Sequence, residues 1–358
     1  MKVLIKKSIL ETMLLNIQPY LEKKDLSQIT SHVLLFSQEG QFTLKATDYE
    51  IGLSYATKEI KTLSSGFATA NGKKLLDIIK SLRESKEDDI TLETINDYLY
   101  IKQNSSKYKL PMLNPNDFPE FPSIDSKPKF EINNATLVKS IKKIAPAIDT
   151  NNPKFELNGS LIDIKNNTIN LVATDTKRLA VVKIEQENDH DFSLIIPKKA
   201  ISEIQKLFFD NIEIFYDENT LIALSSQFTF FTKLINGKFP DYERIIPKNK
   251  NFRILLNRES MVDAIKQIAI ISQEIKLTFK PEKVVFESLN DDNIEAKTEI
   301  EFKTGLDSDI FLAVNSRYLL DFLSNIENSN FTLGFNDSSL PFTLESDNFT
   351  TIVMPIMI

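Results

Sequence analysis

The segment Ile132–Ile144, INNATLVKSIKKI, decides the fold, because the chain carries the same pattern three times. IKKSILETMLLNI at Ile5–Ile17 and LNRESMVDAIKQI at Leu256–Ile268 align with it without gaps, at offsets of 127 and 124 residues. Each copy begins with a strand-like residue, continues with polar residues and then follows helical periodicity. From Leu137, apolar residues recur at i, i+4, i+7 and i+11, which predicts one buried helix face.

A second pattern also occurs three times, at Phe67–Leu82, Ser193–Phe208 and Phe311–Ile326. Each copy reads as a strand, a short polar break and an amphipathic helix. The triplet Ala-Thr-Asp follows an alternating strand at residues 46–48 and again at 173–175, and Phe-Pro recurs at 118–119 and 239–240. Four sets in the same order, at nearly constant spacing, indicate an internal repeat.

We therefore predict an α+β chain of three repeated domains, each with antiparallel sheets and two helices. The predicted domains are 1–125, 126–247 and 248–358. Their boundaries fall near Pro122–Pro128 and Pro247–Asn251, where Pro, Lys, Asn and Ser cluster.

The composition excludes several classes of site. The chain has no cysteine, so disulfides, thiol nucleophiles and cysteine-ligated metals are excluded. Glycine is scarce at 8 residues, and no glycine-rich phosphate motif is present. The two histidines, His32 and His190, are expected at a strand end and in a polar loop. We expect no metal, no cofactor and no catalytic residue.

The start of the chain, its hydropathy and its net charge say little about function. Lys6 and Lys7 interrupt the apolar start, so it does not read as a signal peptide, and no run of 18 apolar residues predicts a membrane helix. A cytoplasmic location is expected. The net charge of −7 argues weakly against a nucleic-acid-binding protein, because the distribution of charge matters more than its sum.

The helix faces opposite the apolar ones are basic. Their cations are Lys73, Lys80 and Arg83 in the first repeat, Lys139, Lys142, Lys143, Lys198, Lys199 and Lys206 in the second, and Arg258, Lys266 and Arg317 in the third. One interpretation is an ordinary solvated helix face. The other is a basic channel: twelve helices of two chains, each about 10 Å wide, would close a ring roughly 38 Å across, which admits duplex DNA. Lysines would then contact phosphates without reading sequence.

The chain resembles the bacterial DNA sliding clamps, the beta subunits of DNA polymerase III, over essentially its whole length. The most specific stretches are ATDTKRLA at 173–180, NGKFPDYERIIP at 236–247 and VMPIMI at 353–358. The resemblance implies a clamp fold with two helices per domain lining a central channel, in a head-to-tail ring-shaped homodimer. It implies a non-catalytic processivity factor that encircles duplex DNA and tethers the replicative polymerase, the clamp loader and repair proteins through short peptides.

The resemblance also implies positions for the sites. The peptide pocket between the second and third domains would comprise Leu157, Thr174, Arg178, Leu179, Pro240, Arg244, Ile245, Pro341, Ile352, Val353, Met354, Pro355 and Ile356. Apolar walls suit Leu or Phe anchors, and the arginines suit peptide carbonyls or acidic groups. Tyr108 and Leu110 would meet Ile270 and Ile271 in the dimer, and Lys24 would contact DNA.

Two departures and two alternatives stay open. Thr176-Lys177 stands where the family often has Gly-His, and threonine adopts positive φ with difficulty. Met357 replaces a basic residue near the end. The alternatives are a carboxylate-dependent hydrolase using Asp48 and Asp175, which more plausibly lie in turns, and a repeat scaffold that binds proteins but not DNA.

Overall fold

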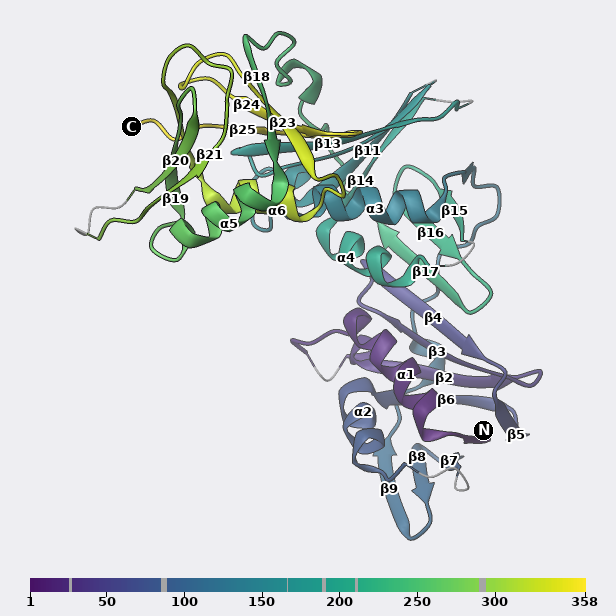
Figure 1. Cartoon of the computed structure of the whole chain (residues 1–358). Coiled ribbons are helices and arrows are strands. Elements are labelled where there is room, and N and C mark those ends of the chain that lie inside the picture. Colours follow the sequence, from purple (N-terminus) through teal and green to yellow (C-terminus); the bar gives the residue numbers. More distant parts are fainter. Residues whose placement is uncertain (26–27, 85–88, 166, 189–190, 210–211, 290–293) are drawn as a thin grey trace. The chain divides into compact units, whose positions relative to one another are not determined.

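The computed structural model describes residues 1–25, 28–84, 89–165, 167–188, 191–209, 212–289 and 294–358 of the chain. The chain divides into two compact units (Figure 1). Unit 1 comprises Met1–Ile132 and Asp210–Leu234, and unit 2 comprises Asn133–Phe209 and Ile235–Ile358.

The repeat predicted from the sequence is confirmed in the order of the elements. Each repeat holds two helices: α1 (Lys7–Ile17) and α2 (Gly72–Ser81), α3 (Asn134–Ile144) and α4 (Lys198–Leu207), α5 (Arg258–Ala269) and α6 (Ser316–Ser324). The strands of the first repeat are β1 (Lys2–Ile5), β2 (His32–Gln38), β3 (Gln41–Thr47), β4 (Ile51–Thr57), β5 (Ile60–Ser64), β6 (Gly66–Asn71), β7 (Ile90–Ile95), β8 (Tyr98–Gln103) and β9 (Ser106–Pro111). Those of the second are β10 (Lys129–Phe130), β11 (Gly159–Lys165), β12 (Thr168–Thr174), β13 (Arg178–Glu185), β14 (Phe192–Pro197), β15 (Glu213–Tyr216), β16 (Thr220–Leu224) and β17 (Phe228–Lys233). Those of the third are β18 (Phe252–Asn257), β19 (Glu274–Phe279), β20 (Lys283–Ser288), β21 (Lys297–Glu301), β22 (Ile310–Asn315), β23 (Asn330–Phe335), β24 (Phe342–Ser346) and β25 (Phe349–Val353).

Asparagine begins four of these helices. The side chains of Asn71, Asn133, Asn257 and Asn315 each accept a backbone N–H of the first helical turn. This cap satisfies a donor that the helix itself leaves unpaired and stabilises it by about 1 kcal/mol. Asn133 and Asn257 therefore start the first helix of the second and third repeats, and Asn71 and Asn315 start the second helix of the first and third.

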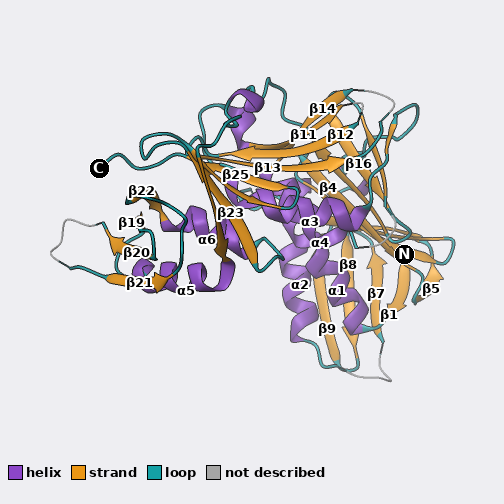
Figure 2. Ribbon diagram, turned by 45° about the horizontal axis from the view of Figure 1, so that its top comes forward, coloured by secondary structure: helices purple, strands orange, loops and turns teal. Residues whose placement is uncertain are grey.

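Each helix pair covers its own sheet in the same way. α1 packs on β3 and β4, α3 on β12 and β13, and α5 on β20 and β21, and the two helices of each repeat touch each other. Figure 2 shows α5 and α6 against β19–β22 in unit 2. Leu137, Ile141 and Ile144 of α3 are buried, as the periodicity predicts. Burying one such side chain contributes about 1.5–3 kcal/mol.

The sheets of unit 1 join two repeats. One sheet has the order β5-β1-β7-β8-β9, and the other has β10-β15-β16-β17-β4-β3-β2-β6. β4 of the first repeat pairs with β17 of the second, with Phe230 facing Leu53. The strands β15–β17, which lie within the predicted domain 126–247, therefore belong to the same sheet as β2–β4.

Unit 2 repeats this arrangement one step further along the chain. Its larger sheet has the order β14-β11-β12-β13-β25-β24-β23-β18, and its smaller sheet has β21-β20-β19-β22. β13 of the second repeat pairs with β25 of the third, with Arg178 facing Val353. The junctions β4–β17 and β13–β25 are both antiparallel, as expected from the sequence. Within the described part of the chain, no helix is both long and apolar enough to cross a membrane.

Candidate functional site

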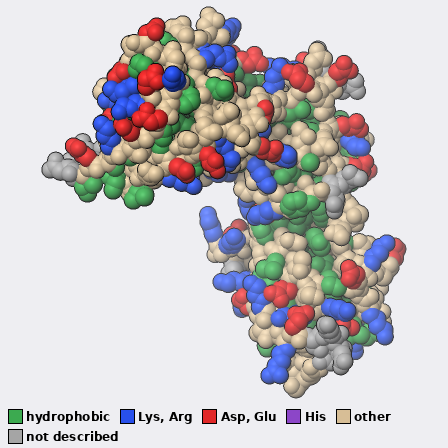
Figure 3. Space-filling model, in the orientation of Figure 1, with side chains coloured by type: hydrophobic (Ala, Val, Ile, Leu, Met, Phe, Trp, Pro, Cys, Tyr) green, Lys and Arg blue, Asp and Glu red, His purple; other side chains and the backbone are tan. Residues whose placement is uncertain are grey.

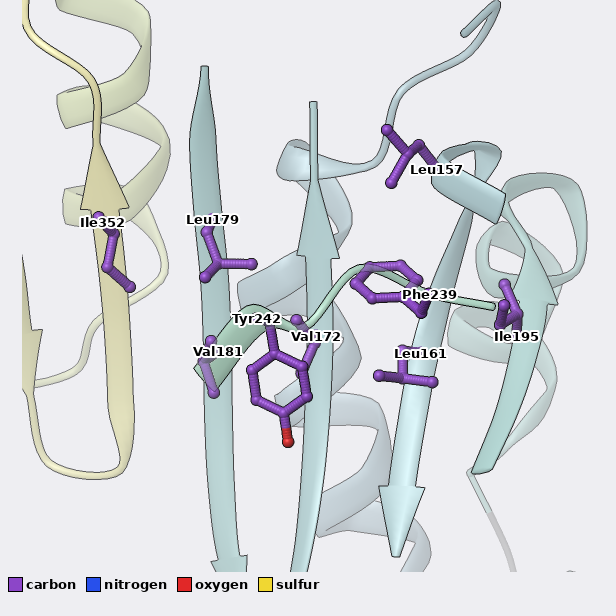
Figure 4. Close-up of a cluster of buried hydrophobic side chains, with 9 residues drawn as sticks. All are labelled: Leu157, Leu161, Val172, Leu179, Val181, Ile195, Phe239, Tyr242 and Ile352. Atoms are coloured by element: carbon purple, nitrogen blue, oxygen red, sulfur yellow. The ribbon is translucent and has the colours of Figure 1, made fainter. Parts of the chain in front are cut away.

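An apolar cluster covers one face of the larger sheet in unit 2. Its side chains come from β11, β12, β13, β14 and β25, from the short helical turn Phe155–Asn158 and from the segment that follows β17 (Figure 4). The cluster comprises Leu157, Leu161, Val172, Leu179, Val181, Ile195, Phe239, Tyr242 and Ile352. Three of these, Leu157, Leu179 and Ile352, were predicted as pocket residues. Phe239 and Tyr242 were not, although both lie in NGKFPDYERIIP, one of the stretches that carry the family resemblance.

Tyr242 anchors the segment 235–246 to the sheet. Its hydroxyl donates to Asp163 Oδ2 at 2.6 Å, and burial, followed by this bond, raises the pKa of Tyr242 well above its ordinary value. Lys165 lies 3.2 Å from the same carboxylate and also pairs with Glu243. Ile235 N donates to Ile195 O at 2.9 Å. The segment is therefore fixed at both ends.

The turn between β12 and β13 is built from its own side chains. Thr174 Oγ1 donates to Arg178 O at 2.6 Å, and Asp175 Oδ1 accepts the backbone N–H groups of Lys177 and Arg178. Thr176 takes φ of +72° at its centre. The threonine therefore occupies the left-handed conformation that a glycine would adopt more easily.

The equivalent turn in the first repeat has the same construction. Thr47 Oγ1 donates to Ile51 O at 2.9 Å, Asp48 Oδ1 accepts from Ile51 N at 3.0 Å, and Tyr49 has φ of +73°. Asp48 and Asp175 thus hold turns, as their structural interpretation predicts. Among the described residues, His, Asp and Glu side chains nowhere gather in threes as a metal site requires. The two residues on which the hydrolase alternative depended, Asp48 and Asp175, therefore have structural roles.

Arg178 is engaged inside the protein. Its side chain is 5% exposed, and its Nε and Nη1 donate to Asp175 Oδ2 at 3.0 Å and Asp321 Oδ2 at 2.7 Å. Nη2 donates to Pro146 O, and the guanidinium lies 4.6 Å from the centroid of the Tyr318 ring. Arg178 therefore links the turn of the second repeat to helix α6 of the third. Tyr318 and Asp321 were not identified from the sequence, because nothing local indicates a partner 143 residues away.

The C-terminal segment docks against this turn. The strand β25 ends at Val353, and beyond it Met354 N donates to Lys177 O at 2.9 Å. Ile356 N donates to Ala313 O of β22 at 2.7 Å. The backbone of the tail is thus held between the two repeats, while the side chain of Met354 stays 43% exposed.

The predicted pocket residues fall into two groups. The buried ones form a floor: Leu157, Thr174, Arg178, Leu179, Ile352 and Val353. The half-buried or exposed ones form the accessible surface: Pro240, Arg244, Ile245, Pro341, Met354, Pro355 and Ile356. The side chain of Arg244 is 86% exposed and pairs with Asp241 at 2.7 Å. A ligand would therefore meet the second group.

A cavity in unit 2 lies elsewhere. It is enclosed by α5, α6 and both sheets of the third repeat, with Met261, Ile265, Leu319 and Leu323 among its lining. All of its lining side chains are apolar. Since a ligand site normally adds convergent polar groups to an apolar wall, this cavity belongs to the core.

The cations predicted in the first repeat are accessible. Lys24, Lys73, Lys80 and Arg83 are exposed, and cationic side chains are visible beside α2 (Figure 3). The exposed positions of α1 are instead uncharged, with Ser, Thr and Leu. Among the predicted cations of the first repeat, Lys73 and Lys80 therefore lie on α2, Arg83 follows it, and Lys24 lies in the loop before β2.

In unit 2 the predicted cations differ in their freedom. Lys142, Lys199 and Lys266 are exposed, and of these Lys199 also interacts within the chain. Six others have protein partners: Lys139 pairs with Glu327, Lys143 donates to Asn348, Lys198 to Ile148 O, Lys206 pairs with Glu203, Arg258 donates to Leu323 O, and Arg317 lies 3.7 Å from Asp321. Burial lowers the pKa of Lys143 and of Lys198. Helical spacing alone could not separate these two groups.

Two of the predicted dimer residues, Tyr108 and Leu110, lie on an edge strand, and the other two, Ile270 and Ile271, follow helix α5, which packs on the edge strand β21. In unit 1, β9 pairs with β8 and forms the edge of its sheet, with Tyr108 half-buried and Leu110 buried. In unit 2, β21 pairs with β20 and forms another edge. Ile270, just after α5, is 82% exposed, and Ile271 is exposed beside it.

His32 has no part in these surfaces. His32 is buried at the start of β2, where burial and then the charge of Lys74 lower its pKa to about 4. His190 lies outside the described residues. Fold and site together define a repeat protein for binding other macromolecules, with exposed cations on its helices, an apolar surface and open sheet edges such as β9 and β21.

Comparisons with known proteins place this chain more narrowly. Residues 1–122, 131–241 and 243–357 match the N-terminal, central and C-terminal domains of the DNA polymerase III beta subunit. The beta sliding clamp of Helicobacter pylori is 40% identical over 99% of this chain and all of that protein, and that of Buchnera aphidicola is 30% identical over 97% and 96%.

Solved structures agree. The H. pylori beta clamp bound to a DNA ligase peptide has a TM-score of 0.94 at 40% identity, and the beta subunit from Pseudomonas aeruginosa has 0.92 at 26%. Each comparison covers both chains completely. The chain belongs to the DNA polymerase III beta subunit family, the sliding clamps, which are non-catalytic processivity factors of that polymerase.

Proposed function

We propose that two copies of this chain close head to tail into a ring around duplex DNA, in the cytoplasm. Each copy contributes three domains, 1–125, 126–247 and 248–358. One observation carries the proposal. At both internal junctions, the strand that ends the front half of one repeat (β4, β13) pairs with the last strand of the next repeat (β17, β25). In the third repeat, β21 is the strand that ends the front half, and in the first repeat, β9 is the last strand. Neither forms such a junction within the chain, and each lies at the edge of its sheet.

The internal junctions share one register, which extends to the proposed contact. Ser54 of β4 faces Thr229 of β17, and Val181 of β13 faces Thr350 of β25. Thr229 and Thr350 are the second residues of their strands. Ser54 and Val181 each face the fifth residue of the preceding strand, β3 or β12.

The same positions can be located on the free edges. Lys107 is the second residue of β9, and Lys297 faces the fifth residue of β20. We therefore expect Lys107 to face Lys297 across the ring contact, and Ser106 to face Thr298. Glu299 and Glu295 would lie diagonally on either side of Lys107, within reach of its ammonium.

The residues beside these edges fit an interface. Ile270 and Ile271 would be covered by the partner's first domain, which removes their exposed apolar surface from water. Tyr108 Oη lies 3.5 Å from Ser81 Oγ at the end of α2, so its ring would border the contact. Leu110, already buried in its own chain, would contribute mainly backbone.

The helices would supply the contacts to DNA. We propose that the exposed cations Lys24, Lys73, Lys80, Arg83, Lys142 and Lys266 carry most of the attraction to phosphates, through sequence-independent counterion release. The predicted cations with interactions inside the protein, Lys139, Lys143, Lys198, Lys199, Lys206, Arg258 and Arg317, would contribute less. Weak and redundant contacts suit a ring whose closure keeps it on DNA.

The apolar surface of unit 2 would tether partners. The H. pylori relative binds a DNA ligase peptide, which supports peptide binding here. We propose that the polymerase, the clamp loader and repair proteins dock through short peptides at the site of the thirteen predicted pocket residues. Ile245, Met354 and Pro240 would contact the anchor, and the buried residues, Arg178 among them, would support this surface from beneath. The flexible thioether of Met354 can adapt to different anchors.

An engineered disulfide tests the ring contact. The chain has no cysteine, so Ser106→Cys with Thr298→Cys introduces one unambiguous pair. Mild oxidation of this variant should give a covalent dimer on a non-reducing gel. The matched control, Ser106→Cys with Lys297→Cys, shifts the register by one residue and should cross-link far less. Equal cross-linking of both variants, or of neither, would contradict the proposed pairing.

A further inference from the structure

One face of the smaller sheet in unit 1 combines tyrosine and lysine side chains. The strand pairing aligns its residues in rows that cross β1, β7, β8 and β9. One row consists of Lys2, Glu93, Tyr100 and Lys109, and the next row consists of Leu4, Thr91, Lys102 and Lys107. Tyr98 lies on the same side of β8, two residues before Tyr100. We name these two rows together with Tyr98 the tyrosine–lysine face.

The tyrosine–lysine face points away from the core of unit 1. Successive side chains of a strand alternate between the two faces of a sheet. Leu99 and Ile101, which alternate with the tyrosines on β8, are buried. Tyr108 stands between the two lysines of β9, and its hydroxyl lies 3.5 Å from Ser81 Oγ at the end of α2. The face is therefore separate from the cations that α2 presents on the other side of the sheet.

Positive charge exceeds negative charge on this face. Its rows hold four lysines and one glutamate, which leaves a surplus of three positive charges. Glu93 lies 3.0 Å from Lys2 and 2.5 Å from Lys102, so one carboxylate serves two ammonium groups. Lys107 and Lys109 are exposed, and within the described ranges neither of them forms an ion pair. The face thus concentrates cations in a chain whose net charge is −7.

Each lysine of β9 lies over a tyrosine of β8. Lys107 Nζ is 4.9 Å from the centroid of the Tyr100 ring, and Lys109 Nζ is 3.6 Å from that of Tyr98. An aromatic ring attracts an ammonium group without neutralising its charge. Because the strands are antiparallel and the pairs are two residues apart, two equivalent lysine–tyrosine pairs follow each other along the hairpin, about 6.8 Å apart.

We infer that the tyrosine–lysine face binds single-stranded nucleic acid, with bases stacked on Tyr98 and Tyr100 and phosphates beside the lysines. A base stacked on an aromatic ring gains more than an exposed cation–π contact does, so a base can displace the lysine stem. The displaced ammonium group then turns to a phosphate. Some RNA-binding domains bind single strands in the same way, on aromatic side chains of one sheet face.

The rings favour nucleic acid over other polyanions. An acidic protein segment would pair with the lysines but would gain nothing specific from two tyrosine rings beside them. Duplex DNA would also meet the lysines, but its bases are stacked on each other and are not available to the rings. Tyr98 is 37% exposed, which leaves ring surface for an unpaired base.

Binding of a short labelled oligonucleotide tests the inference. A fluorescent strand of about 12 thymidines is titrated with the full-length protein, and anisotropy is measured between about 50 and 500 mM salt. For a single strand, the affinity falls with about the 0.7 power of salt for each phosphate contact, so three contacts predict a loss of about 100-fold over this range. A uridine strand of equal length compares RNA with DNA; binding of either supports the inference, and the tighter strand identifies the source.

Variants of the two tyrosines test the stacking. Tyr98→Leu with Tyr100→Leu should weaken binding at least tenfold, because both stacking surfaces are lost. Tyr98→Phe with Tyr100→Phe keeps the rings and should bind within about twofold of the wild-type protein. The matched control is Phe67→Leu, which removes another exposed ring of unit 1 that lies outside this face, and it should leave the affinity unchanged.

A lysine variant tests the position of the phosphates. Lys109→Gln removes one contact, so the loss of affinity between about 50 and 500 mM salt should shrink from about 100-fold to about 25-fold. If Lys73→Gln and Lys80→Gln reduce the salt dependence and Lys109→Gln does not, the strand lies against α2 and the inference is wrong. Unchanged affinity in the double leucine variant, or displacement of the strand by polyglutamate of equal charge, would likewise overturn it.

Discussion

The role of Arg178 can be tested quantitatively, because in the structure its side chain joins the turn between β12 and β13 to helix α6 and does not contact a ligand. Its guanidinium is 5% exposed, is shared between Asp175 and Asp321, and lies over the Tyr318 ring. Removing one partner of a buried ion pair costs about 3–5 kcal/mol. Because Asp321 is partly exposed, we expect about 3 kcal/mol for Arg178→Met and about 1–2 kcal/mol for Asp321→Asn, which keeps an acceptor oxygen.

The two changes should not add. Once the guanidinium is gone, the carboxylate of Asp321 has lost the partner that it stabilises, so the double variant should be about 1–2 kcal/mol more stable than the sum of the single effects predicts. Arg317→Met is the matched control. Arg317 lies 3.7 Å from the same carboxylate but is 72% exposed, so its loss should cost less than about 0.5 kcal/mol.

Urea unfolding and peptide affinity together show whether Arg178 positions the turn and the tail or binds the peptide directly. If Arg178 positions the turn and the tail, Asp321→Asn should weaken peptide binding, because it loosens helix α6 from the turn. If Arg178 grips the peptide directly, Asp321→Asn releases the guanidinium, and affinity should hold or rise. Additive destabilisation together with undiminished peptide affinity in Asp321→Asn would refute the reasoning.

Three further predictions concern the tail, the interface and pH. Deleting Met354–Ile358 should abolish peptide binding in anisotropy assays and leave the dimer mass unchanged; retained affinity would refute the pocket assignment. Changing both Ile270 and Ile271 to Glu should give monomers in sedimentation, since the charges would have to be desolvated in the contact; a persisting dimer would move the interface elsewhere. The lowered pKa of His32, about 4 against 6.5, means that the unfolded chain takes up the proton first as pH falls from 6.5 to 4. The free energy of unfolding should drop by up to about 3 kcal/mol across that window, as urea titrations would measure, and His32→Asn should lack this component.

The repeat could be predicted from the sequence because its signals are local. The apolar spacing that begins at Leu137 lies within one helix, and the asparagine that caps this helix, Asn133, lies four residues before Leu137. The turns holding Asp48 and Asp175 are also local, since each side chain bonds to backbone two or three residues on. Such features do not depend on which distant segments meet.

The rest depends on long-range pairing, which periodicity does not encode. The strand pairs that join repeats bring Leu53 to Phe230 and Arg178 to Val353, and no local pattern specifies them. Arg178 had been expected to face a ligand, because its partner on α6 was invisible in the sequence. Lys143 and Lys198 were likewise assigned by helical spacing, although each bonds to another part of the chain.

Topological retention on DNA tests the ring most directly. The protein cross-linked between Ser106→Cys and Thr298→Cys would be closed around nicked circular DNA by oxidation after assembly, then washed in about 1 M salt, which screens the lysine–phosphate contacts. The covalent dimer should stay on the circle and leave when the DNA is cut once. Loss from the intact circle, or equal retention on circular and linear DNA, would contradict encirclement.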